Sequence, residues 1–239
     1  MVSFGTSRFH FFHAIVCLGM ILAARPLEAA GISVKFDRHA PAATPMPSNL
    51  FTVPAPEHTT GREVRLPLPD CAAHPSDCTL VAALNTLDGF NLQPRLSIPF
   101  TGSIDPHTAT EETVFLLRLS DPRGHSVSTS PQHVEKIALN QLVWDATSQT
   151  LHAESDEFLQ QNTHYALIVT RSVRDGFGRK LSRRGFLRFL KRLYSTPDGW
   201  PYLYELSSAV VAARAAGISF TDLAGVSVFT TQTTTTALE

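Results

Sequence analysis

The chain has 239 residues, of which 43% are hydrophobic, and this length and composition are typical of a globular protein with one or two domains. Its 20 basic and 21 acidic residues give a formal net charge of −1. The near balance gives no electrostatic sign of a nucleic-acid-binding protein, and we predict no nucleic-acid partner.

Residues 1–29 have the features of a secretory signal peptide. Arg8 supplies a weakly basic start, an apolar core runs over 14–24, and 27–29 offer small or apolar residues before a cleavage point. The apolar core is shorter than the roughly 20 residues that span a bilayer, and Cys17 lacks the small preceding residue of a lipoprotein signal. We therefore expect an exported protein that is periplasmic, associated with the outer membrane, or extracellular.

The following segment, 30–60, contains five prolines and few charges. We expect it to be extended, either as a leader or draped along the surface of the next domain. Residues 61–70 are predicted to form an edge strand, because Pro67 and Pro69 remove donors that a central strand would need.

Cys71 and Cys78 are the two cysteines that follow the signal segment. In an exported chain we predict that they form a local disulfide, since the turn-rich stretch AAHPSD between them can fold back on itself. The alternatives are two free thiols or a zinc site, although a zinc site lacks a second cysteine pair here. A bridge over so small a loop would contribute about 2–3 kcal/mol in the chain-entropy model.

Residues 61–182 contain short stretches of strand-forming residues separated by glycine, proline, aspartate and serine. The predicted strands occupy 94–100, 113–120, 137–145, 150–155 and 165–173, and a tight turn at Asp175-Gly176 follows the last of them. Strands at this spacing predict a sandwich. The expected fold class is therefore mainly β, an immunoglobulin-like β-sandwich with a short C-terminal α-helical extension.

The pattern changes after Ser182. Residues 183–194 and 202–216 have apolar residues at helical spacing, and 224–231 again resembles a strand. The stretch 183–239 is too small to have its own core, and 236–239 match a capping box that begins a helix. We expect a helix–helix–strand extension that is the truncated start of a linker to a missing domain.

Two groups of motifs resemble known families. RLSIPFTGSIDPHTATEETVFLL at 95–117, with LHAESDEFLQQNTHYALIVTRSVRDGFGRKL at 151–181, resembles bacterial Ig-like domains of the S-layer and adhesin type. NTLDGFNLQPRLSIPF at 85–100 and SVFTTQTTTTALE at 227–239 resemble the N-terminal region of secreted bacterial lipases of the virulence-factor type. That resemblance implies an Ig-like region preceding an α/β-hydrolase domain, and the hydrolase domain has no counterpart in this sequence.

The residues themselves show no catalytic constellation. The G-x-S-x-G elbow of an α/β-hydrolase does not occur, because Gly102-Ser103 and Gly225-Val226-Ser227 each lack the second glycine. The histidines from His39 onward show no HExxH motif, and the adjacent carboxylates at 111–112 and 156–157 are interpreted as solvated caps. We predict no catalytic residue, no metal ligand and no cofactor.

The basic helix at 183–194 is the candidate interaction surface. Its basic residues flank an apolar stripe, and the candidate residues are Arg184, Phe186, Arg188, Phe189, Lys191 and Arg192. Such a helix can lie on an anionic membrane or lipid surface, which a lipolytic enzyme could use. It can also pack its apolar stripe against a neighbour, which is the interpretation that we favour.

The predicted function is that of the non-catalytic N-terminal module of an exported lipase or esterase, which supports or covers a hydrolase domain normally present in cis. The alternative is a stand-alone interaction module of the cell envelope that binds protein or glycan. A third hypothesis is a small hydrolase with an unrecognised catalytic constellation.

Overall fold

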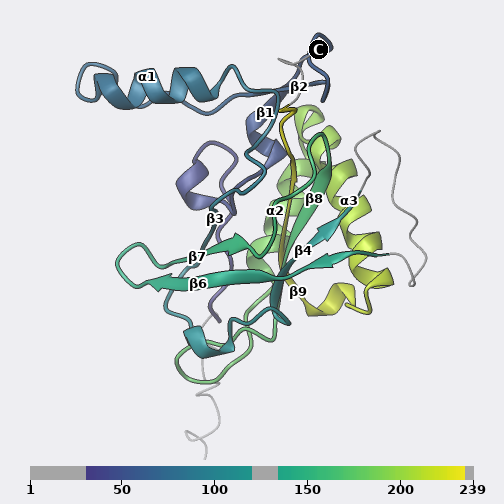
Figure 1. Ribbon diagram of the computed structural model, residues 1–239. Helices are drawn as coiled ribbons and strands as arrows, with labels where there is room; N and C mark the ends of the chain where they lie inside the picture. Colours follow the sequence, from purple (N-terminus) through teal and green to yellow (C-terminus); the bar gives the residue numbers. More distant parts are fainter. Residues whose placement is uncertain (1–30, 120–133, 235–239) are drawn as a thin grey trace, which may run out of the picture. The chain divides into compact units, whose positions relative to one another are not determined.

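The computed structural model describes residues 31–119 and 134–234, which form three antiparallel sheets and three α-helices (Figure 1). A small sheet pairs β1 (Thr52–Pro54) with β2 (Arg62–Val64). The two larger sheets have the strand orders β3-β7-β6 and β5-β4-β8-β9. Their strands are β3 (Leu96–Pro99), β4 (Val114–Arg118), β5 (Lys136–Ile137), β6 (Leu139–Asp145), β7 (Thr150–Ser155), β8 (His164–Thr170) and β9 (Leu223–Thr230). The helices are α1 (Pro75–Leu84), α2 (Arg184–Tyr194) and α3 (Trp200–Ala215).

The central strand β4 is apolar on both faces because another layer covers each face. Val114 and Leu116 belong to a core that the four-stranded sheet shares with the three-stranded sheet. Phe115 and Leu117, which alternate with them, belong to a second core formed with α2 and α3. The four-stranded sheet is therefore a middle layer, with the three-stranded sheet on one face and the two helices on the other (Figure 1).

The segment that precedes β1 belongs to both cores. Antiparallel bridges at Val34 and Met46 join it to the edge of the β3 region. Phe36 stacks on Phe189 of α2, with the two ring centroids 4.7 Å apart. The segment contains two 3₁₀ turns, Pro41–Ala43 and Asn49–Phe51, so it is less extended than its proline content suggested.

The prediction of a mainly β fold is confirmed, but the structure differs from the sequence-based prediction in one strand and in one helix that was not predicted. Residues 61–70 form a strand only over Arg62–Val64. The turn-rich stretch after Cys71 instead leads into α1, which begins at Pro75, has Asp77 in its first turn and continues through good helix formers. Helix α1 buries only Cys78 and stands away from the large sheets (Figure 1).

Residues 183–234 are integrated with the sheets. Strand β9 is buried along its whole length and pairs with β8, and α2 and α3 cover the middle layer. The described residues from Gly31 onward belong to one compact unit. The signal segment 1–29 and the capping-box residues 236–239 lie outside the described residues.

Candidate functional site

The six candidate residues on α2 divide between the interior and the surface. Phe186 and Phe189 are 0% and 3% exposed, respectively, and pack in the core beneath the helix. The four basic candidates, Arg184, Arg188, Lys191 and Arg192, are exposed to solvent. The apolar stripe of α2 thus finds its packing partner within this chain, and only the cationic face is left for a partner.

The cations of α2 have no carboxylate partner among the described residues. None of the salt bridges in that part of the chain involves Arg184, Arg188, Lys191 or Arg192. The stretch 183–218 carries six basic residues and two carboxylates, although the whole chain has a net charge of −1. Asp198 pairs with Arg38 and Glu205 pairs with Arg62, so neither carboxylate is paired with the cations of α2.

Exposed aromatic rings lie where α2 ends and α3 begins. Tyr194, Trp200 and Tyr204 are 66%, 56% and 76% exposed, respectively. The rings of Tyr194 and Trp200 stack with centroids 5.9 Å apart, and Trp200 Nε1 donates to the carbonyl oxygen of Tyr194 at 3.1 Å. An open hollow of about 490 Å³ is lined by these two rings with Ser195 and Pro197. We call the exposed side of α2 and α3, with these cations and rings, the helical surface.

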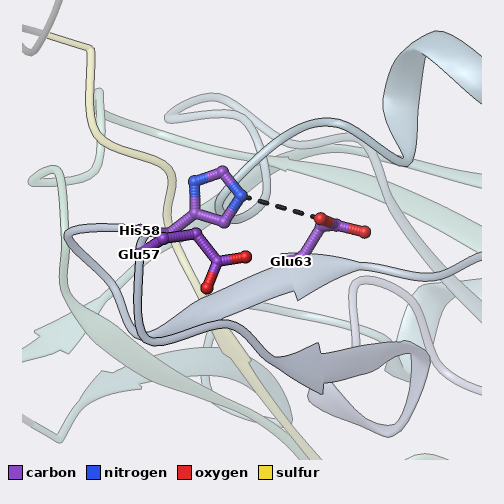
Figure 2. A group of neighbouring side chains, drawn as sticks. All are labelled: Glu57, His58 and Glu63. Carbon is purple, nitrogen blue, oxygen red and sulfur yellow. Dashed lines mark ion pairs between the residues drawn. The ribbon is translucent and has the colours of Figure 1, made fainter.

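Glu57, His58 and Glu63 form a second cluster, in the β1–β2 hairpin (Figure 2). One ligand atom from each lies within 4.8 Å of the others, and His58 Nε2 is 3.7 Å from Glu63 Oε2. Imidazole nitrogen and carboxylate oxygen are donors that suit a divalent metal such as zinc. Arg65, however, already contacts the other oxygen of Glu63 at 2.6 Å, so this carboxylate has a cationic partner without a metal.

No sequence pattern groups these three residues, because they match no metal-binding motif. Backbone hydrogen bonds of the tight loop, from Ala55 N to Gly61 O and from Gly61 N to His58 O, fold the hairpin back and bring Glu63 beside His58. The sequence feature that could have indicated this hairpin is the turn sequence Thr59-Thr60-Gly61, which lies between a Glu-His pair and a strand. A neighbouring hollow of about 520 Å³ is lined by His58, Glu63, Arg65, Leu68, Ala82, Asn85 and Thr86.

A buried polar network joins α3 to the β1–β2 hairpin and to β9. Glu205 of α3 pairs with Arg62 and accepts a hydrogen bond from Asn49 Nδ2 at 2.8 Å. Asn49 Nδ2 also donates to Thr230 Oγ1 at 2.9 Å, and that oxygen lies 3.4 Å from His164 Nδ1. Burial raises the pKa of Glu205, whereas burial and the nearby charge of Arg62 lower the pKa of His164 to about 4.

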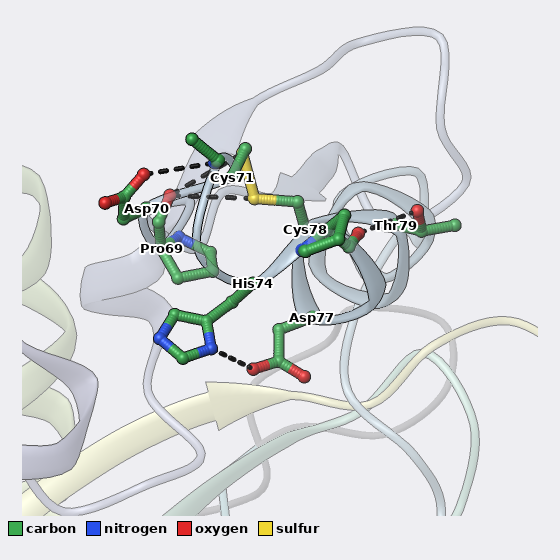
Figure 3. Close-up of a disulfide and its surroundings, with 9 residues drawn as sticks. Pro69, Asp70, Cys71, His74, Asp77, Cys78 and Thr79 are labelled. Atoms are coloured by element: carbon green, nitrogen blue, oxygen red, sulfur yellow. Dashed lines mark hydrogen bonds and ion pairs between the residues drawn. A yellow bond between two sulfur atoms is a disulfide. The ribbon is translucent and has the colours of Figure 1, made fainter.

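The predicted disulfide between Cys71 and Cys78 is present, with the two Cα atoms 5.5 Å apart (Figure 3). It links the turn before α1 to the first turn of that helix. Close to the bridge, His74 Nδ1 lies 3.9 Å from Asp77 Oδ2. The bridge therefore holds a local structure around the start of α1.

The two stretches that carry the lipase resemblance contact each other. Phe90 N donates to Thr230 O at 2.8 Å, and Gln232 N donates to Phe90 O at 2.7 Å, which forms a parallel bridge at the end of β9. A Cβ on Gly89 would lie 2.7 Å from Gln232 N, so only glycine fits there. Asp88 Oδ1 accepts a hydrogen bond from Thr233 N at 2.9 Å. We call this contact between 88–90 and 230–233 the Asp-Gly-Phe clamp.

Ser227, which follows Gly225-Val226, is poorly placed to act as a nucleophile. Ser227 is 1% exposed on β9 and donates to the carbonyl oxygens of Pro45 and Pro47. Tyr202 Oη lies 3.3 Å from its hydroxyl and also accepts from Val228 N. Ser227 therefore belongs to the structural core.

In the described part of the chain no helix is long and apolar enough to cross a membrane.

Comparisons with known proteins give weak structural matches only. No family model and no curated protein matches the chain. A structure of domains 1–6 of the surface layer protein SbsC has a TM-score of 0.29 at 11% identity, covering 46% of this chain and 15% of that chain. The N-terminal part of the bacterial S-layer protein SbsC has a TM-score of 0.28 at 12% identity, covering 48% of this chain and 27% of that chain. Likeness this low assigns neither a fold family nor a function.

Proposed function

We propose that this chain is a non-catalytic module of an exported bacterial lipase or esterase, and that it supports or covers a hydrolase domain encoded outside the present sequence. In this proposal the fold is an immunoglobulin-like β-sandwich. Its support is the arrangement of the two larger antiparallel sheets, whose inner faces meet in one core. The helices α2 and α3 are then an added layer on the outer face of one sheet.

The observation that carries the proposal is the Asp-Gly-Phe clamp. The resemblance to the lipase N-terminal region rests on 85–100 and 227–239, which are far apart in the chain. Phe90 and Thr231 bring these stretches into one parallel bridge, and Gly89 is sterically required at their contact. A resemblance in two stretches that are distant in the sequence is more informative when the two stretches are in contact. The contact then accounts for the residue types found in both stretches.

Export is part of the same proposal. Residues 1–29 have the pattern of a secretory signal. The disulfide between Cys71 and Cys78 fits an oxidising compartment, since such bonds are rare in reducing cytosol.

The test begins with the coding sequence that follows the codon of Glu239. We expect a hydrolase domain with G-x-S-x-G, either in frame or after one frameshift. An unrelated gene there would overturn the proposal and would favour a stand-alone envelope module.

The second step compares ester hydrolysis by the long chain and by residues 30–239. We expect p-nitrophenyl ester hydrolysis by the long chain, its loss when the serine of G-x-S-x-G is replaced by alanine, and none from residues 30–239 alone. Hydrolysis by residues 30–239 that survives purification to homogeneity would show that the module is itself an enzyme.

A further inference from the structure

The helical surface combines two features that proteins use at the boundary between water and lipid. Its α2 side carries the cations Arg184, Arg188, Lys191 and Arg192, and its α3 side carries exposed aromatic rings. We propose that this surface binds the headgroup region of a bilayer that contains anionic phospholipid. The inference concerns the surface of the module itself and does not depend on the proposed hydrolase partner.

Charge is the first argument. A helix whose exposed face is basic is attracted to anionic headgroups, and each lysine or arginine near such a surface contributes independently. The four cations of α2 are exposed, and none is neutralised by a carboxylate among the described residues. Their positive charge stands out in a chain whose overall net charge is −1, so it marks one surface rather than the whole protein.

The aromatic rings are the second argument. Tryptophan and tyrosine favour the interface because one part of the side chain is apolar and another is polar. The indole N–H of Trp200 already donates to Tyr194 O, so the ring can enter the headgroup region without leaving an unsatisfied donor. Tyr204 lies one helical turn beyond Trp200 on the same face of α3, and Val211, 51% exposed, continues that face.

The interior of the layer makes this surface rigid. Phe186, Phe189 and Leu193 of α2 are at most 3% exposed. The helix therefore needs no rearrangement to present its cations, and its buried stripe is not available for lipid. We expect shallow, salt-sensitive binding by the outer residues and no insertion of α2.

The test uses residues 30–239, which include the whole compact unit and omit the apolar stretch 14–24 that would itself bind lipid. The chain has two tryptophans, and Trp144 is half-buried near Phe100. The Trp144→Phe variant leaves Trp200 as the only indole reporter. With vesicles of phosphatidylcholine and 30% phosphatidylglycerol, we expect a blue shift of its emission and quenching by brominated lipid.

Charge variants separate this surface from general electrostatics. We expect Arg188→Gln and Lys191→Gln each to weaken partitioning onto the anionic vesicles about fivefold, which corresponds to about 1 kcal/mol per cation. The matched control is Arg95→Gln, because Arg95 is exposed beside β3 in the other large sheet and should leave partitioning unchanged. Raising the salt concentration should weaken binding of the unaltered chain more than that of the variants.

Aromatic variants test the second argument. When partitioning is measured by co-sedimentation with the vesicles, Trp200→Ala and Tyr204→Ser should reduce it. Phe158→Ser should not, although Phe158 is 74% exposed. Circular dichroism checks that each variant is folded. The proposal is overturned if the vesicles cause no change in Trp200 emission, or if the control variants weaken binding as much as the helical-surface variants. Binding to soluble anionic polysaccharide without binding to vesicles would also overturn it and would assign the surface to glycan.

Discussion

Gly89 is a residue whose identity is restricted by close backbone contact in the fold. Because glycine has no side chain, the end of β9 can pack directly against it. An added Cβ would lie 2.7 to 2.8 Å from backbone atoms of Thr230, Thr231 and Gln232. We expect Gly89→Ala to lower the free energy of unfolding by about 1–3 kcal/mol, the usual cost of overpacking. Gly176→Ala is the matched control, since no atom lies within 4 Å of its added Cβ. Urea unfolding of both variants measures the difference, and equal stabilities would refute the clamp.

His164 makes the stability depend on pH. Its pKa falls from 6.5 to about 4 on folding, chiefly because it is buried and secondly because of the charge of Arg62. Between pH 4 and pH 6.5 the unfolded chain binds a proton at His164 that the folded chain does not bind. The stabilising contribution of the buried, neutral histidine is therefore complete above pH 6.5 and is lost as the pH falls toward 4. The loss is at most about 3 kcal/mol for a shift of this size.

The measurement compares urea midpoints at pH 7 and pH 4.5. The raised pKa of Glu205 acts in the opposite direction, so variants are needed to isolate the histidine. We expect His164→Gln to flatten the pH dependence and His107→Gln, at an exposed position, to leave it unchanged. A titration of His164 near 6.5 in the folded protein, followed by NMR, would contradict this prediction.

At the scale of single elements, the strand prediction succeeded where side chains alternate between two environments. The alternation in β3 is plain in Leu96 and Ile98, which face the shared core. In β4 and β8 nearly every residue is apolar because both faces are buried, so alternation is absent. The prediction of these two strands rested on their strand-favouring residues. Helix α1 was missed because its ten residues bury only Cys78 and carry no apolar stripe. Helical spacing of apolar residues, the pattern that indicated α2 and α3, is therefore absent from α1.

The disulfide is expected to hold α1 and little else. A ten-residue helix is marginal alone in water, and α1 has only one buried residue, Cys78. We expect the double variant Cys71→Ser/Cys78→Ser to speed hydrogen exchange across residues 75–84, while exchange in β9 stays slow because β9 is buried along its length. Unchanged exchange in α1 after loss of the bridge would show that other contacts hold the helix.

Helix α2 offers two neighbouring residues with opposite roles. Phe186 is 0% exposed and Leu187 is 39% exposed. We expect Phe186→Ala to cost about 3–5 kcal/mol of stability, as for other large-to-small changes in a core. Leu187→Ala should change stability by less than about 0.5 kcal/mol. Thermal and urea unfolding give both values, and a small effect at Phe186 would mean that α2 is not part of the core.

The candidate sites differ in how far the sequence indicated them. The cations of α2 were found because helical spacing separates them from Phe186 and Phe189. The aromatic part of the helical surface was missed, since Trp200 and Tyr204 look like core residues until the buried face of α3 is known. The Glu57–His58–Glu63 cluster depends on the loop geometry of one hairpin, which sequence spacing alone does not give.

For the whole molecule, the structure makes a sharp prediction about the stretch 61–182, which the sequence indicated as a sandwich. That stretch lacks β9, so β8 would become an open edge, and it lacks α2 and α3, so Phe115, Leu117 and Ile168 would be uncovered. It also lacks the segment that bridges to the β3 region. A fragment limited to 61–182 should therefore aggregate or stay unfolded.

Residues 30–239 should instead unfold in one cooperative transition, because strands, helices and the N-terminal segment share two contiguous cores. Circular dichroism and the fluorescence of Trp144, measured in a Trp200→Phe variant, should report the same urea midpoint: circular dichroism senses the helices and sheets, and Trp144 senses the core between the sheets. Two separate midpoints, or a fragment 61–182 with dispersed amide resonances in its NMR spectrum, would show that the sheets form an independent domain. In that case the helical layer would be an appendage whose packing contributes little to the stability of the strands it covers.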